Sequence, residues 1–302
     1  MAAIAEGRVY VEGNVLSRTL NSLGQTLRIM VQRPAGFFGL LLLVFFVVLS
    51  VVGPIFVKSP QPDVSTIYAP ASAAHPLGTD SQGRDVLAQV IRGGQILLEI
   101  AVIAALIATF IAMTLGALAA VIGGLVDDII ISVTDFVLTI PGLPLLYVLA
   151  GIFRFTNPLF MSIIIGLLDW PGLTRAVRAQ VYSLRQREYV EAARTLDLGT
   201  RRIIFSEILP NMMAYIIISF ALSMVGAIYQ ATSLYFLGFA PLAGDNWGIM
   251  INLAWTQGAI FFQNSIWYIL APVLAIALLS IGLVLFTRAL EDIFNPRLRG
   301  GI

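Results

Sequence analysis

The chain has 302 residues, of which 58% are hydrophobic and only 12% are charged, and its net charge is +1. A soluble domain carries about 25% charged residues, so this composition excludes an ordinary soluble protein and indicates an integral membrane protein. The near-zero net charge gives no basis for binding nucleic acid, and the absence of cysteine excludes disulfides, thiolate nucleophiles and cysteine-ligated metals.

Two single residues exclude further classes of site. His75 is the only histidine, so a multi-histidine metal site is excluded. Lys58 is the only lysine, and no glycine-rich loop precedes it, so the chain has no ATP-binding P-loop of its own.

Six stretches are long and apolar enough to cross a membrane, because a helical span needs roughly 20 apolar residues. They are residues 37–57, 96–122, 129–153, 159–177, 214–239 and 266–287. The first 33 residues are too polar for a signal peptide. We therefore expect an all-α polytopic membrane protein with six transmembrane helices.

The distribution of basic residues predicts the orientation of these spans. If the N-terminus is inside, fourteen of the 18 basic residues fall on the cytoplasmic side. Those left outside are Lys58, Arg84, Arg92 and Arg154. Since basic residues concentrate in cytoplasmic segments, both termini and residues 185–210 are predicted to be cytoplasmic.

Two irregular spans contain candidates for a translocation pathway. The third span holds Asp135, Pro141 and Pro144, and the fourth holds Asp169. Carboxylates inside a membrane are usually functional, and prolines free backbone carbonyls that are tolerated only beside protein or a water-filled cavity. The alternatives are that each carboxylate pairs with a nearby arginine or serine, and that the prolines only shape packing.

The cytoplasmic loop contains the segment EYVEAARTLDLGTRRIIFSEILPN, which predicts two short helices joined by a tight turn. The first helix would cover residues 185–196, and the second would cover residues 203–208 and end at Pro210. Gly199 suits the left-handed position after the first helix, and Thr200 can cap the second. The first helix would expose Glu188, Glu191, Ala192 and Thr195.

This segment resembles the EAA loop of ABC importer permeases, with Glu191, Ala192, Ala193, Ile208, Leu209 and Pro210 in register. Residues 170–194 match the family along their whole length. Three further segments are similar to the dipeptide/oligopeptide permease subfamily, in particular to its second permease subunit. They are HPLGTDSQGRDVLAQVIRGG at 75–94, LGFAPLAGDNWGIMI at 237–251 and NPRLRG at 295–300.

The resemblance implies a type I ABC importer fold, also called the MetI-like permease fold. One extra span at 37–57 would follow a cytoplasmic segment at 1–36. An external loop at 58–95, with a short amphipathic helix near 84–91, would lead to a five-helix core at 96–287. A cytoplasmic tail would occupy 288–302.

The resemblance also implies the partners. They would be a homologous second permease subunit, two cytoplasmic ATPase subunits and an extracytoplasmic solute-binding protein, with lipids of a prokaryotic inner membrane around the spans. The pathway would lie between the two permeases. ATP and magnesium would be bound by the ATPases, so this chain would need no cofactor and catalyse no covalent chemistry.

Particular residues take on roles through the resemblance. The expected contacts with an ATPase are Glu188, Glu191, Ala192, Ala193, Thr195 and Gly199. The external candidates for docking a binding protein are Asp245, Asn246 and Trp247. The solute would be a di- or oligopeptide, with oligosaccharides, nickel or glutathione as alternatives.

The sequence departs from the family at one place in the loop. The family places a glycine where this chain has Asp197, and the nearest glycine is Gly199. We expect that the turn has moved and that Gly199 has the positive φ. The competing interpretation keeps the turn at Asp197, with its side chain capping the second helix.

Two functions of other classes fit the sequence less well. A proton-coupled transporter would use Asp135 or Asp169, but no inverted repeat is evident. An intramembrane hydrolase would need a triad such as His75, Asp80 and Ser81, and a Gly/Pro-rich loop offers no scaffold to orient one. We expect that loop to be structural.

Overall fold

A computed structural model describes residues 34–242 and 244–294, and all that follows concerns these residues. They form helices and connecting loops, with no β-strand in this part of the chain. The helices are α2 Pro34–Val51, α3 Gly53–Phe56, α4 Val86–Ile122, α5 Gly124–Leu138, α6 Gly142–Phe153, α7 Pro158–Leu184, α8 Glu188–Thr195, α9 Thr200–Arg202, α10 Leu209–Asn211, α11 Met213–Phe236, α12 Trp247–Thr256 and α13 Ile266–Phe294. Short 3₁₀ turns lie at Val64–Thr66, Ala259–Phe261 and Gln263–Ser265, and a π-helical segment lies at Ile203–Ile208.

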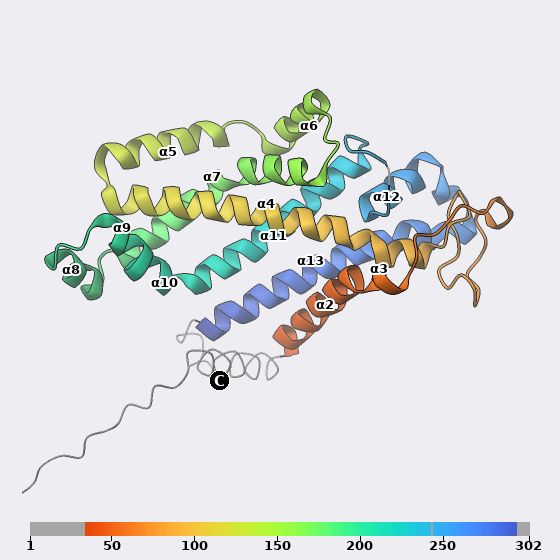
Figure 1. Cartoon of the computed structure of the whole chain (residues 1–302), viewed down its shortest axis with the longest axis horizontal. Helices are drawn as coiled ribbons and strands as arrows, with labels where there is room; N and C mark the ends of the chain where they lie inside the picture. The colour runs from red at the N-terminus through yellow and green to blue at the C-terminus, as the bar shows by residue number, and fades with distance from the viewer. Residues whose placement is uncertain (1–33, 243, 295–302) are drawn as a thin grey trace, which may run out of the picture.

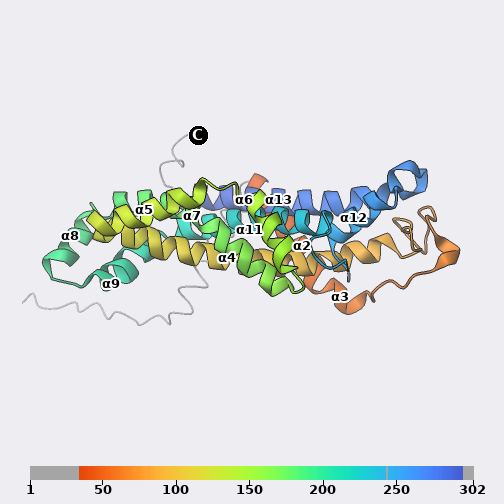
Figure 2. The ribbon, with the colours of Figure 1, turned by 90° about the horizontal axis from the view of Figure 1, so that it is seen from above.

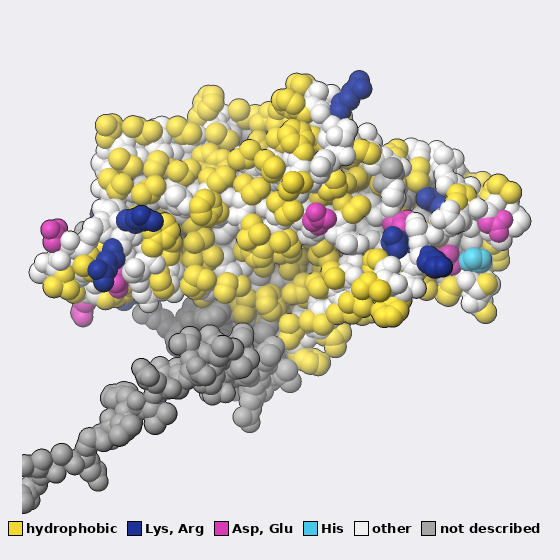
Figure 3. All heavy atoms as spheres, viewed as in Figure 1, with side chains coloured by type: hydrophobic (Ala, Val, Ile, Leu, Met, Phe, Trp, Pro, Cys, Tyr) yellow, Lys and Arg dark blue, Asp and Glu magenta, His cyan; other side chains and the backbone are white. Residues whose placement is uncertain are grey.

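The expected all-α membrane fold is confirmed. Five helices are long and apolar enough to span a membrane, and α5 with α6 forms a sixth span if this bent pair is counted as one. Figures 1 and 2 show a slab of long helices, with α8 and α9 at one end and the loop after α3 at the other. Charged side chains gather towards these ends, and apolar side chains cover most of the surface between them (Figure 3). The predictions for residues 1–33 and for the motif at 295–300 lie outside the described residues.

Three elements differ from the sequence prediction. The external amphipathic helix and the second span are one continuous helix, α4, whose 37 residues extend about 55 Å. The third span is broken, because α5 and α6 meet at a bend of 75°. The fourth span continues past Pro171 and past the predicted end at residue 177 to Leu184, and Asp169 lies near the middle of α7.

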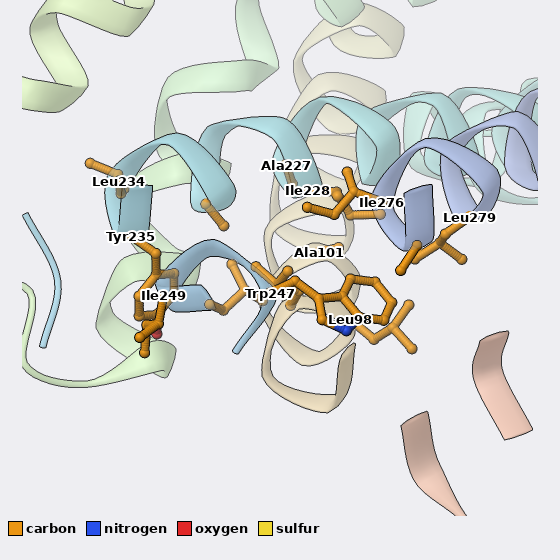
Figure 4. Close-up of a cluster of buried hydrophobic side chains, with 14 of the residues drawn as sticks. Leu98, Ala101, Ala227, Ile228, Leu234, Tyr235, Trp247, Ile249, Ile276 and Leu279 are labelled. Atoms are coloured by element: carbon orange, nitrogen blue, oxygen red, sulfur yellow. The ribbon is translucent and has the colours of Figure 1, made fainter. Parts of the chain in front are cut away.

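The main core lies where α4, α11, α12 and α13 meet (Figure 4). Trp247 of α12 is completely buried there, and its indole nitrogen donates a hydrogen bond to the Val90 carbonyl at 2.8 Å. Gly93 and Gly94 of α4 make room for it, since a Cβ on either residue would come within 2.6–2.7 Å of the indole ring. The tryptophan therefore fixes α12 to the N-terminal half of α4.

A second core cluster anchors the segment from α8 to α10 to the spans. Ala117 and Ala120 of α4 pack with Val177 and Val181 of α7. The loop segment contributes Val190, Ala193, Ile203, Ile204, Ile208 and Met212 to the same cluster. The helices α8 to α10 are therefore held by buried apolar contacts and are not a freely solvated loop.

Candidate coupling and translocation sites

The segment from α8 to α10, here called the hairpin, exposes most of the predicted coupling residues. Glu188, Glu191, Ala192 and Thr195 lie exposed on α8, as the sequence predicted. Ala193 does not join them, because it is only 5% exposed and packs in the second core cluster. The need for a small residue at this position comes from the chain's own packing. The second helix also runs further than expected, with Pro210 inside its final turn and not at its end.

The turn of the hairpin is at Asp197, so the expected shift to Gly199 is wrong. Asp197 has φ +52°, in the left-handed region, whereas Gly199 has φ −56° and ψ 150°. The Leu198 amide donates to the Ala193 carbonyl at 3.1 Å and closes the end of α8. Thr200 is the first residue of α9, and Gly199 precedes it without a side-chain cap. An aspartate tolerates this conformation better than most residues with a side chain. The turn can therefore stay at position 197, although Asp197 stands where the family has a glycine.

A polar hollow opens beside α8. Its volume is about 710 Å³, and it is lined by Leu184, Gln186, Arg187, Glu188, Tyr189 and Asn211. The Tyr189 hydroxyl is buried and has no hydrogen-bond partner among the described residues. Burial raises the pKa of the Tyr189 phenol, so this group stays neutral and can donate a hydrogen bond. The hollow thus offers the Glu188 carboxylate and the Arg187 guanidinium on one exposed face, with the unsatisfied Tyr189 hydroxyl buried beside them.

Two acidic residues of α5 are paired with arginines of α7. Asp135 forms an ion pair with Arg175, and both side chains are about half exposed, at 49% and 50%. Asp127 forms a second, more buried pair with Arg178. For Asp135, the structure therefore fits the alternative of pairing with a nearby arginine.

A second hollow, of about 360 Å³, lies at the break between α5 and α6. Asp169 and Pro141 both line it, so two of the predicted pathway residues are brought together. Asp135 and Pro144 do not line it. Both oxygens of Asp169 accept hydrogen bonds from the Gln230 amide of α11, at 2.8 and 2.9 Å.

The three external docking candidates are engaged within the chain. Asp245 pairs with Arg92 at 2.6 Å and accepts a hydrogen bond from the Ser59 hydroxyl at 2.9 Å. Asn246 is 1% exposed and caps α12, where its side chain accepts from the Gly248 amide at 2.7 Å. Trp247 is buried in the core. These residues hold the loops at this end of the molecule together, and neither Asn246 nor Trp247 presents its side chain to a partner.

The loop around His75 is built as a structural unit. His75 pairs with Asp85 at 2.8 Å, and Asp85 also caps α4 by accepting from the Ala88 amide. Asp80 is fully buried and binds the Arg84 and Gln89 side chains at 2.8 and 2.9 Å. His75 is therefore held by Asp85, and a triad of His75, Asp80 and Ser81 does not form.

Sequence reasoning missed several members of these sites. Gln230 is a polar side chain inside an apolar span, and that signal alone marks a candidate. Tyr189 and Asn211 line the polar hollow from opposite ends of the hairpin. Only the folding of the hairpin brings them together, so the sequence offers no comparable signal for them.

A bundle of membrane-spanning helices with a broken span, an intramembrane carboxylate and a charged hairpin at one end defines a polytopic transport subunit. The chain belongs to the family described as binding-protein-dependent transport system inner membrane components, which matches residues 112–300. It is accordingly a multi-pass inner-membrane transport protein.

The relatives agree with this assignment over most of the chain. A protein of Brucella suis named as a peptide permease is 30% identical, with 98% of each chain covered. The dipeptide transport system permease protein DppC of Bacillus subtilis is 34% identical, with 86% of this chain and 81% of that protein covered. The oligopeptide transport system permease protein OppC of Mycobacterium tuberculosis is 32% identical, with 78% and 81% covered.

Proposed function

We propose that the chain is a permease subunit of an ATP-driven ABC importer that carries di- or oligopeptides across the inner membrane. The family match and the names of the relatives support the transport class and the peptide solute. The proposed mechanism rests on the structure of the hairpin. It offers polar groups to a partner outside the membrane, while its apolar side is buried against α4 and α7.

The hairpin is suited to transmit a movement because it is rigidly attached. A partner that contacts α8 pushes on the second core cluster, and this cluster includes residues of both α4 and α7. Packed clusters of this kind move as rigid bodies, so differential contact in two states of the partner can shift the spans. We infer that the partner is a cytoplasmic ATPase subunit and that the hairpin end is cytoplasmic, with both termini on that side.

The remaining subunits follow from the same proposal. A second, homologous permease would complete the pathway, and an extracytoplasmic binding protein would deliver the peptide. ATP and magnesium would be bound by the ATPases, because this chain has no P-loop and needs no cofactor of its own. The purified chain should therefore hydrolyse no ATP, whereas the assembled importer should hydrolyse it and take up peptide.

Ala192 provides a direct test of docking, because it is exposed on α8 and a larger side chain there need not disturb the core. We expect Ala192→Trp to reduce co-purification of the ATPase subunits and peptide uptake at least tenfold, which corresponds to about 1.4 kcal/mol of lost contact. The amount of chain inserted in the membrane should be unchanged.

The matched control is Ala73→Trp, which adds the same side chain at an exposed position in the loop at the opposite end of the molecule. It should leave ATPase association intact. Full association and uptake in Ala192→Trp would show that α8 is a solvated surface and not a docking site.

A further inference from the structure

The hollow at the break between α5 and α6 has an uncompensated negative charge. Of the three aspartates of α5, Asp127 and Asp135 are each paired with an arginine of α7, and Asp128 does not line the hollow. Asp169 of α7 forms no ion pair with any residue in the described ranges, and its hydrogen-bond partner is the neutral amide of Gln230. The charge of Asp169 is therefore left for something that enters the hollow.

The backbone beside this hollow adds partial negative charge. Pro171 lies inside α7 and has no N–H, so the carbonyl one turn before it loses its helical partner. The last turn of α5 also ends at the hollow, and Val137 and Leu138 of that turn line it. The carboxyl end of a helix carries partial negative charge, although here the Asp135, Phe136 and Val137 carbonyls accept hydrogen bonds from the Thr139 and Ile140 amides. All of these features favour a cation over an anion.

The rest of the lining indicates the kind of cation. Ile140, Leu145 and Leu168 give the hollow apolar walls, and its volume of about 360 Å³ exceeds that of a water molecule many times. No group of three or more His, Cys, Asp or Glu side chains that could hold a metal occurs among the described residues. An organic ammonium, with a charged head and an apolar body, suits these walls better than a hydrated metal ion.

The position of Asp169 argues that the hollow is not covered by lipid. It lies eleven residues into α7, or about 17 Å from Pro158, which is near the middle of a bilayer. A carboxylate at this depth is tolerated beside protein or in a water-filled cavity, not against lipid tails.

We propose that this hollow binds the ammonium group of the transported solute, with the Asp169 carboxylate as its counter-charge. The inference rests on the proposed function, since a peptide with a free N-terminus supplies such a group. Gln230 is a positioning residue, because its amide holds both carboxylate oxygens and fixes their direction.

Gly172 allows the charge in the hollow to be measured directly. It lines the hollow, and a Cβ at this position meets no atom within 4 Å, so Gly172→Cys places a thiol there without a clash. The chain has no cysteine of its own, so the thiol can be followed in the complete importer reconstituted in vesicles. We expect a methanethiosulfonate bearing an ammonium to react about tenfold faster than one bearing a sulfonate.

Two variants separate the charge of Asp169 from other effects. Asp169→Asn should remove the preference for the cationic reagent, and Asp169→Glu should retain most of it. Gly151→Cys is the matched control, because its Cβ also meets open space and it lines a different hollow, beside Arg154. Its ratio of rates should not respond to Asp169→Asn. A ratio at Gly172→Cys that is the same with and without the Asp169→Asn substitution would overturn the proposal. Co-purification of all subunits shows that each variant is assembled.

Protection by solute tests whether the hollow is used in transport. Dialanine delivered by the binding protein should slow labelling of Gly172→Cys, and N-acetyl-dialanine and sodium or magnesium chloride should not. Equal protection by both peptides, or protection by neither, would overturn ammonium recognition. Uptake of labelled dialanine by the wild-type importer is measured in parallel. In one outcome, uptake is absent while Gly172→Cys still reacts faster with the cationic reagent. That result would contradict the proposed peptide transport but would leave the negative charge of the hollow in place.

Discussion

Asp197 holds its backbone in a conformation that most side chains avoid. Its φ of +52° closes the turn after α8, while Gly199 two residues later has an ordinary φ of −56°. The left-handed conformation costs a residue with a Cβ roughly 1–2 kcal/mol of conformational free energy, and this penalty is smaller for aspartate than for most residues. The chain therefore contains a mild local strain at its exposed hairpin.

We predict that Asp197→Gly stabilises the hairpin, by up to about 1 kcal/mol, because glycine adopts this conformation without steric cost. Asp197→Val should destabilise it by a similar or larger amount, since a β-branched side chain is least compatible with positive φ. Thermal unfolding of the purified chain in detergent would measure both changes.

Gly199→Ala serves as the comparison at this turn. A Cβ on Gly199 would meet nothing within 4 Å, and its φ is compatible with alanine, so the change should be nearly silent. A larger loss from Gly199→Ala than from Asp197→Val would contradict the assignment of the turn to Asp197.

Among the elements, α12 depends most on a single side chain. Trp247 fills the space above Gly93 and Gly94 and is fully buried, while Trp255 of the same helix is 69% exposed. Removing a buried aromatic side chain costs the lost transfer energy and leaves a cavity, about 3–5 kcal/mol in total. Surface substitutions usually change stability by about 0.5 kcal/mol or less.

We therefore predict that Trp247→Ala lowers the thermal unfolding midpoint far more than Trp255→Ala does. Trp247→Phe should fall between them, because it keeps most of the apolar contact but loses the hydrogen bond to the Val90 carbonyl. If the two alanine variants unfold at the same temperature, α12 is not held by Trp247.

The sequence predicted elements better than it predicted their contacts. The apolar runs indicated the five long spans and the bent pair of α5 and α6, because a bilayer requires long apolar helices wherever they occur. The break after Leu138 was signalled by two prolines. The burial of Ala193 and Trp247 was not predicted, because an exposed loop and a packed hairpin have the same residue pattern until their tertiary partners are known. The pairing of Asp135 with Arg175 likewise joins positions 40 residues apart, and it remained one of two interpretations.

At the scale of the whole molecule, the two ends differ in the residues available for labelling. Because Asn246 is buried, a cysteine there is not a suitable external probe. Ala73 and Thr200 are both exposed and lie in segments at opposite ends of the slab (Figure 1). We predict that Ala73→Cys reacts with a membrane-impermeant thiol reagent added outside spheroplasts and that Thr200→Cys does not.

Permeabilising the membrane should make Thr200→Cys reactive, which shows that its thiol is free. Reaction of Thr200→Cys from outside, before permeabilisation, would reverse the proposed orientation. The unmodified chain is the blank in both cases, since it contains no cysteine.

The helix α4 is long enough to connect the two ends of the molecule directly. One uninterrupted helix of 37 residues joins the seat of Trp247 near one surface to the cluster beneath the hairpin near the other. Over a rod of about 55 Å, a tilt of about 5° displaces one end by about 5 Å relative to the other. If a partner pushes on the hairpin as proposed, a tilt of α4 would carry that movement directly to the opposite end of the molecule.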